Sequence, residues 1–157
     1  MVKREDRPSV HIASLVDLSF VRREAPEIPT DVLEKKIALG EVIVSEQDGQ
    51  PVGFLTFDFI GFASPYLSLI RVSSGHRRRG AGKAMLAFAE RLLEERGLEV
   101  LYSSSQADEP EPQAWHRHMG FEECGTLKDF NRDGIGEVFF RKSLPRRSPR
   151  PPGGQGS

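Results

Sequence analysis

The chain has 157 residues, of which 38% are hydrophobic and 29% charged, a balance that predicts one folded domain and excludes a wholly disordered chain. Its 22 Lys and Arg against 23 Asp and Glu leave a formal net charge of -1, so no overall field draws it to nucleic acid or to an anionic membrane. The single cysteine, Cys124, excludes an internal disulfide and a thiolate zinc site.

The first third of the chain predicts one strand and two short helices. Ser9–Ile12 has the pattern of a strand, and the apolar spacing over residues 15–21 favours a helix that ends before Pro26. Thr30–Asp31 are residue types that cap helices and Gly40 is a residue type that ends them, so a second helix is expected between them.

Three strands are expected in the middle of the chain. Val42–Val44 and Val52–Ile60 are rich in β-branched and aromatic residues, and Asp48–Gly49 between them favours the positive φ angles of a tight hairpin turn. A further apolar run, Tyr66–Val72, follows after a short connection. The three runs together predict an antiparallel meander.

The second half of the sequence alternates helices and strands. Apolar residues at helical spacing over residues 81–97 predict the longest helix, and Leu98–Ser103 predicts the strand after it. A short helix is expected at Pro112–Met119, and a closing hairpin is expected from Phe121–Phe130 and Ile135–Lys142. The order of elements is therefore mixed α/β.

Residues 1–144 are expected to form a single domain. The remaining residues, 145–157, are rich in Pro, Gly and Arg and have no apolar side chain to bury, which predicts a disordered tail. No apolar run approaches the ~20 residues that a membrane helix needs, and the N-terminus lacks a basic stub followed by a hydrophobic segment. The expected location is therefore the cytoplasm, with no membrane partner.

A basic, glycine-containing segment joins the last strand of the meander to the long helix. A helix start presents unpaired N–H groups and partial positive charge, and glycines let a ligand approach the backbone closely, so this context favours a phosphate or pyrophosphate. A solvated basic loop is the alternative. The segment contains three glycines, Gly75, Gly80 and Gly82, and five cations, Arg71, Arg77, Arg78, Arg79 and Lys83.

Two common phosphate-binding motifs do not fit this segment. A dinucleotide-binding GxGxxG requires glycine where Met85 stands, and a Walker loop requires lysine where Ala81 stands. The pattern that does fit is Arg/Gln-x-x-Gly-x-Gly/Ala, present as Arg77, Gly80 and Gly82. It resembles the coenzyme A loop of the GNAT family of N-acetyltransferases.

A second motif supports this resemblance. Ala114–Phe121, which reads AWHRHMGF, looks like the helix of that family that ends in a Leu/Met-Gly-Phe turn. It follows the basic loop in the family's order, with a predicted strand between the two. The resemblance covers roughly Ser9 to Leu144.

The resemblance implies an α/β (α+β) fold: a mixed, mostly antiparallel seven-stranded sheet, flanked by helices and splayed between two central parallel strands. Here those strands are Tyr66–Val72 and Leu98–Ser103. Splayed strands leave N–H and C=O groups that need partners, and the amides of pantetheine can pair with them like an additional strand.

The same resemblance implies acetyl-CoA as the cosubstrate. No metal is expected, because there is one cysteine and no helical i, i+4 partner completes the pair His116 and His118. The backbone N–H of Val72 would bind the thioester carbonyl and stabilise oxyanion charge as the amine attacks, and amides of residues 77–83 would hold the pyrophosphate. The residues implied in coenzyme A binding are Ile70, Arg71, Val72, Arg77, Arg78, Arg79, Gly80, Ala81, Gly82 and Lys83.

The sequence departs from the family at both proton-transfer positions. His116 stands where many members have a tyrosine that protonates the departing thiolate; a neutral imidazole N–H can serve that role, and a packing histidine is the alternative. Ser68 and Tyr66 stand where some members carry a carboxylate or histidine that deprotonates the amine. The base is then a water chain along these hydroxyls or a carboxylate, Asp58 or Glu137; a salt-bridged sheet residue is the alternative for Glu137.

Three functions remain to be compared. The first is an N-acetyltransferase that moves an acetyl group from acetyl-CoA to a primary amine of a small molecule or peptide by direct attack, with no acyl-enzyme at Cys124. The second is a non-catalytic acetyl-CoA-binding regulatory module, which the two departures favour. Nucleic-acid binding through the arginine loop and the tail ranks last. The acceptor, the acyl chain length and the choice between monomer and homodimer stay open.

Overall fold

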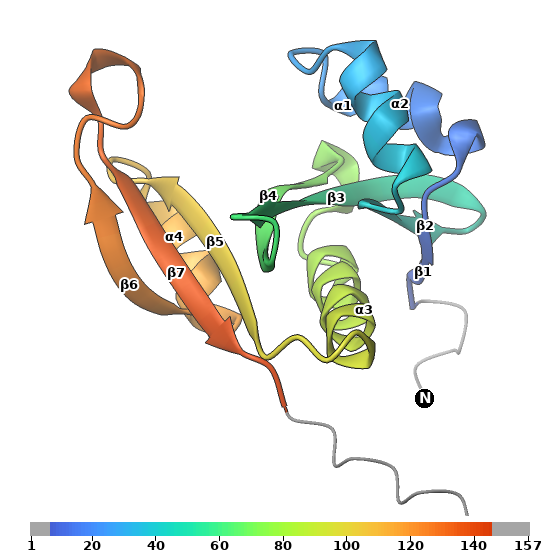
Figure 1. The fold of residues 1–157 in the computed structure, drawn as a ribbon. Helices are drawn as coiled ribbons and strands as arrows, with labels where there is room; N and C mark the ends of the chain where they lie inside the picture. The colour runs from blue at the N-terminus through green and yellow to red at the C-terminus, as the bar shows by residue number, and fades with distance from the viewer. Residues whose placement is uncertain (1–6, 146–157) are drawn as a thin grey trace, which may run out of the picture.

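The computed structural model describes residues 7–145, which form a seven-stranded sheet with helices on both faces (Figure 1). The strand order is β1-β2-β3-β4-β5-β7-β6. The strands are β1 (Ser9–Ile12), β2 (Val42–Gln47), β3 (Gln50–Ile60), β4 (Ser64–Val72), β5 (Val100–Gln106), β6 (Glu122–Leu127) and β7 (Glu137–Ser143). The helices are α1 (Leu18–Glu24), α2 (Thr30–Ala38), α3 (Ala81–Glu95) and α4 (Pro110–His118). The expected mixed, mostly antiparallel α/β (α+β) fold is confirmed.

The sheet consists of two halves that meet at β4 and β5, which form the one parallel pair among the described strands. Every other pair in that part of the chain is antiparallel. β4 and β5 are in register only at Tyr66 with Tyr102 and at Leu67 with Ser103, although β4 continues to Val72. The two strands therefore diverge beyond Leu67, as Figure 1 shows, and this divergence is the expected splay.

A β-bulge in β4 explains why the strands separate at this point. Thr56 of β3 pairs with Leu69, whereas its neighbour Phe57 pairs with Leu67, which leaves Ser68 as an extra residue. Ser68 Oγ lies 2.8 Å from Thr56 Oγ1 and donates to the Thr56 carbonyl oxygen at 3.1 Å. A bulge bends its strand and increases the local twist, so the C-terminal end of β4 turns away from β5.

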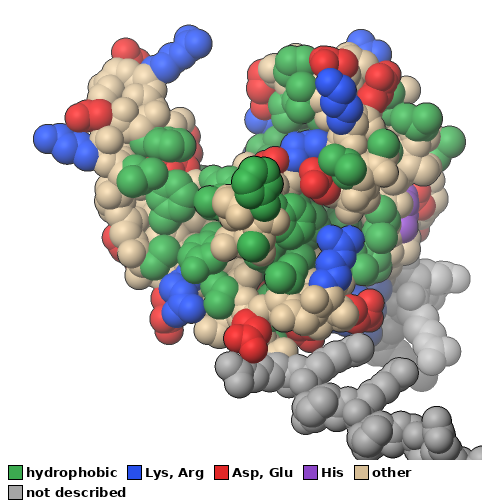
Figure 2. Space-filling view, in the orientation of Figure 1, with side chains coloured by type: hydrophobic (Ala, Val, Ile, Leu, Met, Phe, Trp, Pro, Cys, Tyr) green, Lys and Arg blue, Asp and Glu red, His purple; other side chains and the backbone are tan. Residues whose placement is uncertain are grey.

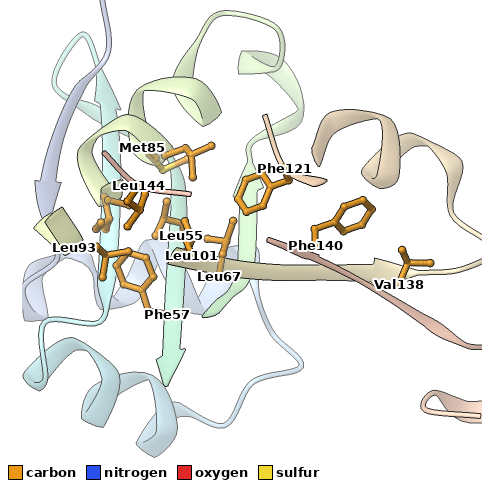
Figure 3. Close-up of a cluster of buried hydrophobic side chains, with 13 residues drawn as sticks. Leu55, Phe57, Leu67, Met85, Leu93, Leu101, Phe121, Val138, Phe140 and Leu144 are labelled. Atoms are coloured by element: carbon orange, nitrogen blue, oxygen red, sulfur yellow. The ribbon is translucent and has the colours of Figure 1, made fainter. Parts of the chain in front are cut away.

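Two clusters of buried hydrophobic side chains hold the helices on the sheet. The larger cluster joins α3 to both halves of the sheet and includes Met85, Leu55 and Phe121 (Figure 3). The smaller cluster lies between the sheet and the α1–α2 pair, where Phe20 and Phe54 pack edge to face at 6.4 Å. α3 lies on the opposite face of the sheet to α1 and α2, so the N-terminal half of the sheet has helices on both faces.

The first hairpin agrees with the sequence pattern, whereas the start of the second helix does not. Asp48 and Gly49 have φ angles of 52° and 75°, which confirms the predicted tight turn. The N-cap of α2 is Pro29 rather than Thr30–Asp31, and no side chain caps the helix. Pro29, with φ -57° and ψ 140°, already directs the chain into the helix, so Thr30 becomes its first residue.

The central strand β5 lies further along the chain than its apolar residues indicate. It begins at Val100 rather than Leu98 and continues past Ser103 to Gln106. The added residues are held by pairing with β7, for example Ser104 with Phe139. Three successive serines give no apolar signal, and their place in the sheet depends on a partner distant in sequence.

The predicted tail, residues 145–157, lies outside the described residues apart from Pro145. No helix within residues 7–145 is long and apolar enough to cross a membrane.

Candidate active site

The gap between β4 and β5 contains a cavity of about 940 Å³. Leu67–Val72 of β4 and Ser103–Gln106 of β5 form its walls, and it extends over the loop before α3 and along α4. Figure 2 shows this face of the molecule hollowed between the β6–β7 hairpin and the α1–α2 pair, with hydrophobic side chains on the floor. The splayed strands thus enclose a space of the size that small-molecule and cofactor sites have.

The backbone of β4 directs hydrogen-bonding groups into this cavity. Ser73 N donates to Val52 O at 2.8 Å, so Ser73 and Val52 form a hydrogen-bonded antiparallel pair. Such pairs alternate with pairs that exchange no hydrogen bond, and the adjacent pair, Val72 with Gly53, is of the second kind. The N–H groups of Val72 and, by the same alternation, of Ile70 therefore point away from β3 and toward the gap.

The loop between β4 and α3 forms a backbone cradle suited to an anion. Gly80, the N-cap of α3, has a φ of 87°, a conformation that favours glycine, and Arg78 has a φ of 62°. Ala84 N is bonded to Gly80 O at 2.9 Å, so the N–H groups of residues 81–83 precede the helical ladder and have no partner within it. The first turn of this 15-residue helix contains no acidic side chain, so its partial positive charge is uncompensated.

Four cations of the basic segment surround this cradle. Arg77, Arg78, Arg79 and Lys83 are all exposed. Arg77 Nε donates to Val72 O at 3.2 Å, which folds the start of the loop back onto the end of β4. Within residues 7–145 none of the four forms an ion pair, so their charge is available to an anionic ligand.

The side chain of Arg71, the fifth cation, is engaged elsewhere. Its guanidinium donates to the carbonyl oxygen of Glu24, the last residue of α1, at 2.6 Å, and to the carboxylate of Glu27, three residues further on. The hydrogen bond from Arg71 lowers the pKa of Glu27 below 4.5. Ser73 also donates to Glu24, at 3.1 Å. Arg71 therefore fastens the N-terminal helices to the end of β4, and its charge is balanced there.

His116 is 5% exposed on α4, and its ring is stacked on Phe140 at 4.6 Å. Its Nδ1 lies 2.7 Å from Pro112 O, and its Nε2 lies 2.7 Å from Ser103 Oγ. A carbonyl only accepts, so Nδ1 carries the proton of the neutral ring, and Nε2 accepts from the Ser103 hydroxyl, whose other acceptor, Leu67 O, lies farther away at 3.3 Å. Burial lowers the pKa of His116 below 6.5, against the opposing effect of the Pro112 hydrogen bond. The ring is therefore neutral near pH 7.

Glu137, at the start of β7, lies on the cavity wall and is 8% exposed. Its Oε1 accepts a hydrogen bond from Ser104 Oγ at 2.6 Å, and its Oε2 accepts one from Asn131 Nδ2 at 2.7 Å. Tyr66 Oη lies 2.5 Å from Ser104 Oγ. Burial raises the pKa of Tyr66; the Ser104 hydrogen bond opposes this shift and the charge of Glu137 adds to it.

Asp58, the other carboxylate considered as a base, is occupied by a lysine. Lys36 Nζ donates to Asp58 Oδ1 at 2.6 Å and to Phe57 O at 2.5 Å, and it also reaches Glu41 Oε2 at 3.2 Å. Lys36 is only 17% exposed, whereas the side chain of Asp58 is 48% exposed. The structure thus brings Glu137, and not Asp58, to the cavity wall.

Sequence reasoning missed the residues that connect these groups. Ser103 and Ser104 contact His116 and Glu137 from opposite faces of β5, and Asn131 contacts Glu137 from the turn of the last hairpin. The signal for the two serines is the run of three hydroxyl residues, Ser103–Ser105, which begins at the last residue of the predicted strand. Asn131 gives no such signal, because its contact depends on the fold of the hairpin.

One group of potential metal ligands lies away from the cavity, within the described residues. His11, Asp17 and Glu46 place ligand atoms within 4.8 Å of one another. His11 Nε2 is bonded to Asp17 Oδ2 at 3.1 Å, and the same carboxylate oxygen accepts the Ser14 N–H at 2.9 Å. These contacts explain the cluster as a link between β1 and the turn before α1.

Solved structures with the same fold are acetyltransferases. The chain is 30% identical to a ribosomal-protein-alanine N-acetyltransferase from Brucella melitensis, over 87% of this chain and 99% of that chain, with a TM-score of 0.73. It is 25% identical to a GNAT-family acetyltransferase from Bacillus cereus ATCC 10987, over 89% and 99%, with a TM-score of 0.75. The fold also matches the ribosomal-protein-S18-alanine N-acetyltransferase from Escherichia coli, at 17% identity over 93% and 99%, with a TM-score of 0.75.

The sequence matches a family model as well. The model of the acetyltransferase (GNAT) family matches residues 12–121, more than half of the chain. This range contains the basic loop, both splayed strands and the helix of His116. No curated protein sequence matches the chain. The matched range, the splayed sheet and the related structures agree, and the chain belongs to the GNAT family of acetyltransferases.

Proposed function

We propose that this protein transfers an acetyl group from acetyl-CoA to a primary amine by direct attack. The observation that carries the proposal is the arrangement of two backbone features in one cavity: the N–H of Val72, which points into the gap, and the N-terminus of α3, whose first N–H groups have no partner within the helix. Acetyl-CoA has a thioester carbonyl and a pyrophosphate that match these two features. The pantetheine between them has amides that pair with the open edges of β4 and β5.

In this proposal the basic loop binds the pyrophosphate. Backbone N–H groups of Gly80, Ala81, Gly82 and Lys83 contact its oxygens, with the exposed cations of the loop around them. Ile70 contributes its backbone to pantetheine. Arg77, Arg78 and Arg79 contribute charge, whereas Arg71 supports the site by holding α1 against β4.

The N–H of Val72 is assigned the thioester carbonyl. As the amine attacks, negative charge develops on this oxygen, and a fixed backbone donor at the cavity wall stabilises it at no cost of reorganisation. One such donor contributes roughly 3 kcal/mol in other acyl-transfer sites. Because the donor belongs to the main chain, the side chain at position 72 is secondary.

The role predicted for His116 is proposed in a restricted form. In the neutral ring the Nδ1 proton is donated to Pro112 and Nε2 carries none, so only the imidazolium form can pass a proton across Ser103 to the departing sulfur. Burial lowers the pKa of His116, which makes that form scarce at neutral pH. Any contribution of His116 to leaving-group protonation therefore increases as the pH falls.

The first acceptor to test is a peptide with a free N-terminal alanine. Two related structures are named as ribosomal-protein-alanine N-acetyltransferases, one of them 30% identical to this chain. The open hollow between α1–α2 and the β6–β7 hairpin offers room for an extended chain beside the thioester. Lysine-containing peptides and small amines form the comparison panel.

The experiment measures acetylated peptide and any acetylated protein by mass spectrometry in the wild-type protein, and released coenzyme A by thiol titration in the Cys124→Ser variant, because the exposed Cys124 thiol would add to the titration. Equal amounts of peptide product and free coenzyme A, with no acetylated protein, are expected from direct attack. Acetyl-CoA binding without product from any acceptor would instead establish the non-catalytic module, and an acetyl group retained on the protein would establish a covalent relay.

A further inference from the structure

Three strand-borne side chains form a continuous hydrogen-bonded chain where β4 and β5 separate. Tyr66 Oη, Ser104 Oγ and Glu137 Oε1 follow one another at 2.5 Å and 2.6 Å. Ser104 and Glu137 line the cavity that contains the Val72 N–H, and Asn131 donates to the second oxygen of Glu137 at 2.7 Å. A buried carboxylate is thus connected to the cavity by a hydroxyl.

The direction of each hydrogen bond follows from the chemistry of its groups. An ionised carboxylate only accepts, so the single hydroxyl proton of Ser104 goes to Glu137. Tyr66 must then donate to Ser104, because that hydroxyl has no second proton to give. A hydroxyl oxygen has two lone pairs, and Tyr66 occupies one of them. The other is available to an N–H donor in the cavity.

We infer that Ser104 and Glu137 together are the base that deprotonates the acceptor amine, with Tyr66 and Asn131 as positioning residues. This inference rests on the proposed function. An ammonium N–H proton passes to Ser104 Oγ while the proton of Ser104 passes to Glu137 Oε1, and the nitrogen keeps the electron pair. That pair forms the N–C bond, the C–S pair leaves with sulfur, and the proton that the adduct still carries leaves as the thiol proton of coenzyme A.

This assignment explains how the amine can be deprotonated although β4 carries no carboxylate or histidine at the positions of Tyr66 and Ser68. Ser68 is fixed in the bulge by two contacts with Thr56, so its hydroxyl is not free to carry a proton. The carboxylate reaches the gap from β7 instead, and it does so because β5 and β7 pair through Gln106 with Glu137. The base is therefore built across three strands rather than along one.

Other charged groups near the chain of hydroxyls bear on its pH dependence. Asp58 lies beside Tyr66 on the neighbouring strand and is paired with Lys36. His116, on the other face of β5, responds to the charge of Glu137, which raises its pKa against the larger effect of burial. A His116→Gln variant, assayed in parallel, separates any contribution of that ring from the contribution of Glu137.

The test compares kcat/KM for an alanine peptide and acetyl-CoA, between about pH 7 and about pH 9.5, in Glu137→Gln, Ser104→Ala and Tyr66→Phe. At neutral pH the first two variants are expected to lose about 100-fold and Tyr66→Phe about tenfold. The loss should shrink as the pH passes the pKa of the peptide amine, about 8, because a free amine needs no base. Tyr102→Phe, the neighbouring tyrosine on β5, is the matched control and should behave as wild type.

A loss of equal size at every pH would show a structural defect and overturn the inference, as would an unchanged rate in Glu137→Gln. Calorimetry should give unchanged acetyl-CoA affinity in all four variants. A wild-type protein that binds acetyl-CoA and acetylates nothing would end the proposed function itself.

A second readout does not depend on turnover. The chain has two tyrosines, so a Tyr102→Phe background leaves Tyr66 as the one phenol whose ionisation appears in the absorbance near the tyrosinate band. Because the charge of Glu137 raises the pKa of Tyr66, Glu137→Gln should move this titration to lower pH. A titration that does not move would show that the two groups are uncoupled and would overturn the relay.

Discussion

His116 shows how two hydrogen bonds limit what a side chain can do. With Nδ1 donating to Pro112 O, the neutral ring has no second proton, so its Nε2 accepts from Ser103; the charged ring could keep both contacts, and it is burial that disfavours its charge. The stack on Phe140 adds an apolar contact that further disfavours charge. At this position the sequence leaves open a proton donor or a packing histidine, and the local geometry describes a buried ring whose Nε2 accepts a hydrogen bond.

This environment makes a prediction about stability. Burial lowers the pKa of His116 in the folded state below the 6.5 expected in the unfolded chain, so below pH 6.5 the unfolded state binds more protons. The free energy of unfolding should therefore fall as the pH decreases from about 7 to about 5. Urea unfolding should show a smaller pH dependence in His116→Gln, because that variant has no ring to protonate.

His118 provides the control, since it is exposed on the same helix. His118→Gln should keep the pH dependence of the wild-type protein. The same decrease in stability in wild type and in His116→Gln would show that other groups cause it.

Glu137 is a residue whose place at the cavity depends on contacts with residues distant in the sequence. Its sequence context leaves two interpretations open, a candidate base and a salt-bridged sheet residue. In the structure it accepts two hydrogen bonds and faces the cavity, because β7 pairs with β5 and the turn at Asn131 folds back. No local pattern reports an interaction between residues more than thirty positions apart, such as Ser104 and Glu137.

At the level of elements, the site depends on how α2 is attached to β3. Lys36 of α2 donates to the carbonyl of Phe57 and to Asp58, and it also contacts Glu41 at the start of β2. One partly buried ammonium thus links the helix to two strands. These contacts hold α2 in place, and the α1–α2 pair forms the side of the hollow opposite the β6–β7 hairpin.

Replacement of this lysine should be costly. Lys36→Met leaves the Phe57 carbonyl and two carboxylates without their donor, and a loss of about 2 kcal/mol in the free energy of unfolding is expected. Lys35→Met is the control, because Lys35 is 76% exposed and forms only a surface pair with Asp31. It should change stability by less than about 0.5 kcal/mol. Equal effects of the two substitutions in urea unfolding would contradict this account.

The elements also show which features a single sequence specifies. The turn at Asp48–Gly49 and the helix α3 follow from local residue types, and both agree with the structure. The bulge at Ser68 does not, because it is defined by a register shift against β3. The polar end of β5 is similar: Ser104–Gln106 become a strand by pairing with β7. Local chemistry therefore predicted the basic loop before α3, and long-range pairing determined the shape of the gap and the place of Glu137 on its wall.

For the whole molecule, the distribution of charge matters more than its sum. The net charge is -1, yet four exposed cations gather around the N-terminus of α3. An acidic carboxylate, Glu137, faces the other part of the same cavity. The two ends of the cavity thus carry charges of opposite sign, which matches the anionic coenzyme and the cationic amine of the proposed function. The bulge that separates β4 from β5 makes the two ends parts of one cavity.

The most direct test of this arrangement is the affinity for acetyl-CoA, measured by calorimetry in the wild-type protein and in two glycine variants. Gly80→Asp places a negative charge at the N-terminus of α3, and Gly49→Asp places one in the remote β2–β3 turn at a similar positive φ. The account predicts that the wild-type protein and Gly49→Asp bind acetyl-CoA equally well, and that Gly80→Asp binds about 100-fold more weakly. Absence of binding in the wild-type protein, or equal affinity in Gly80→Asp, would contradict it.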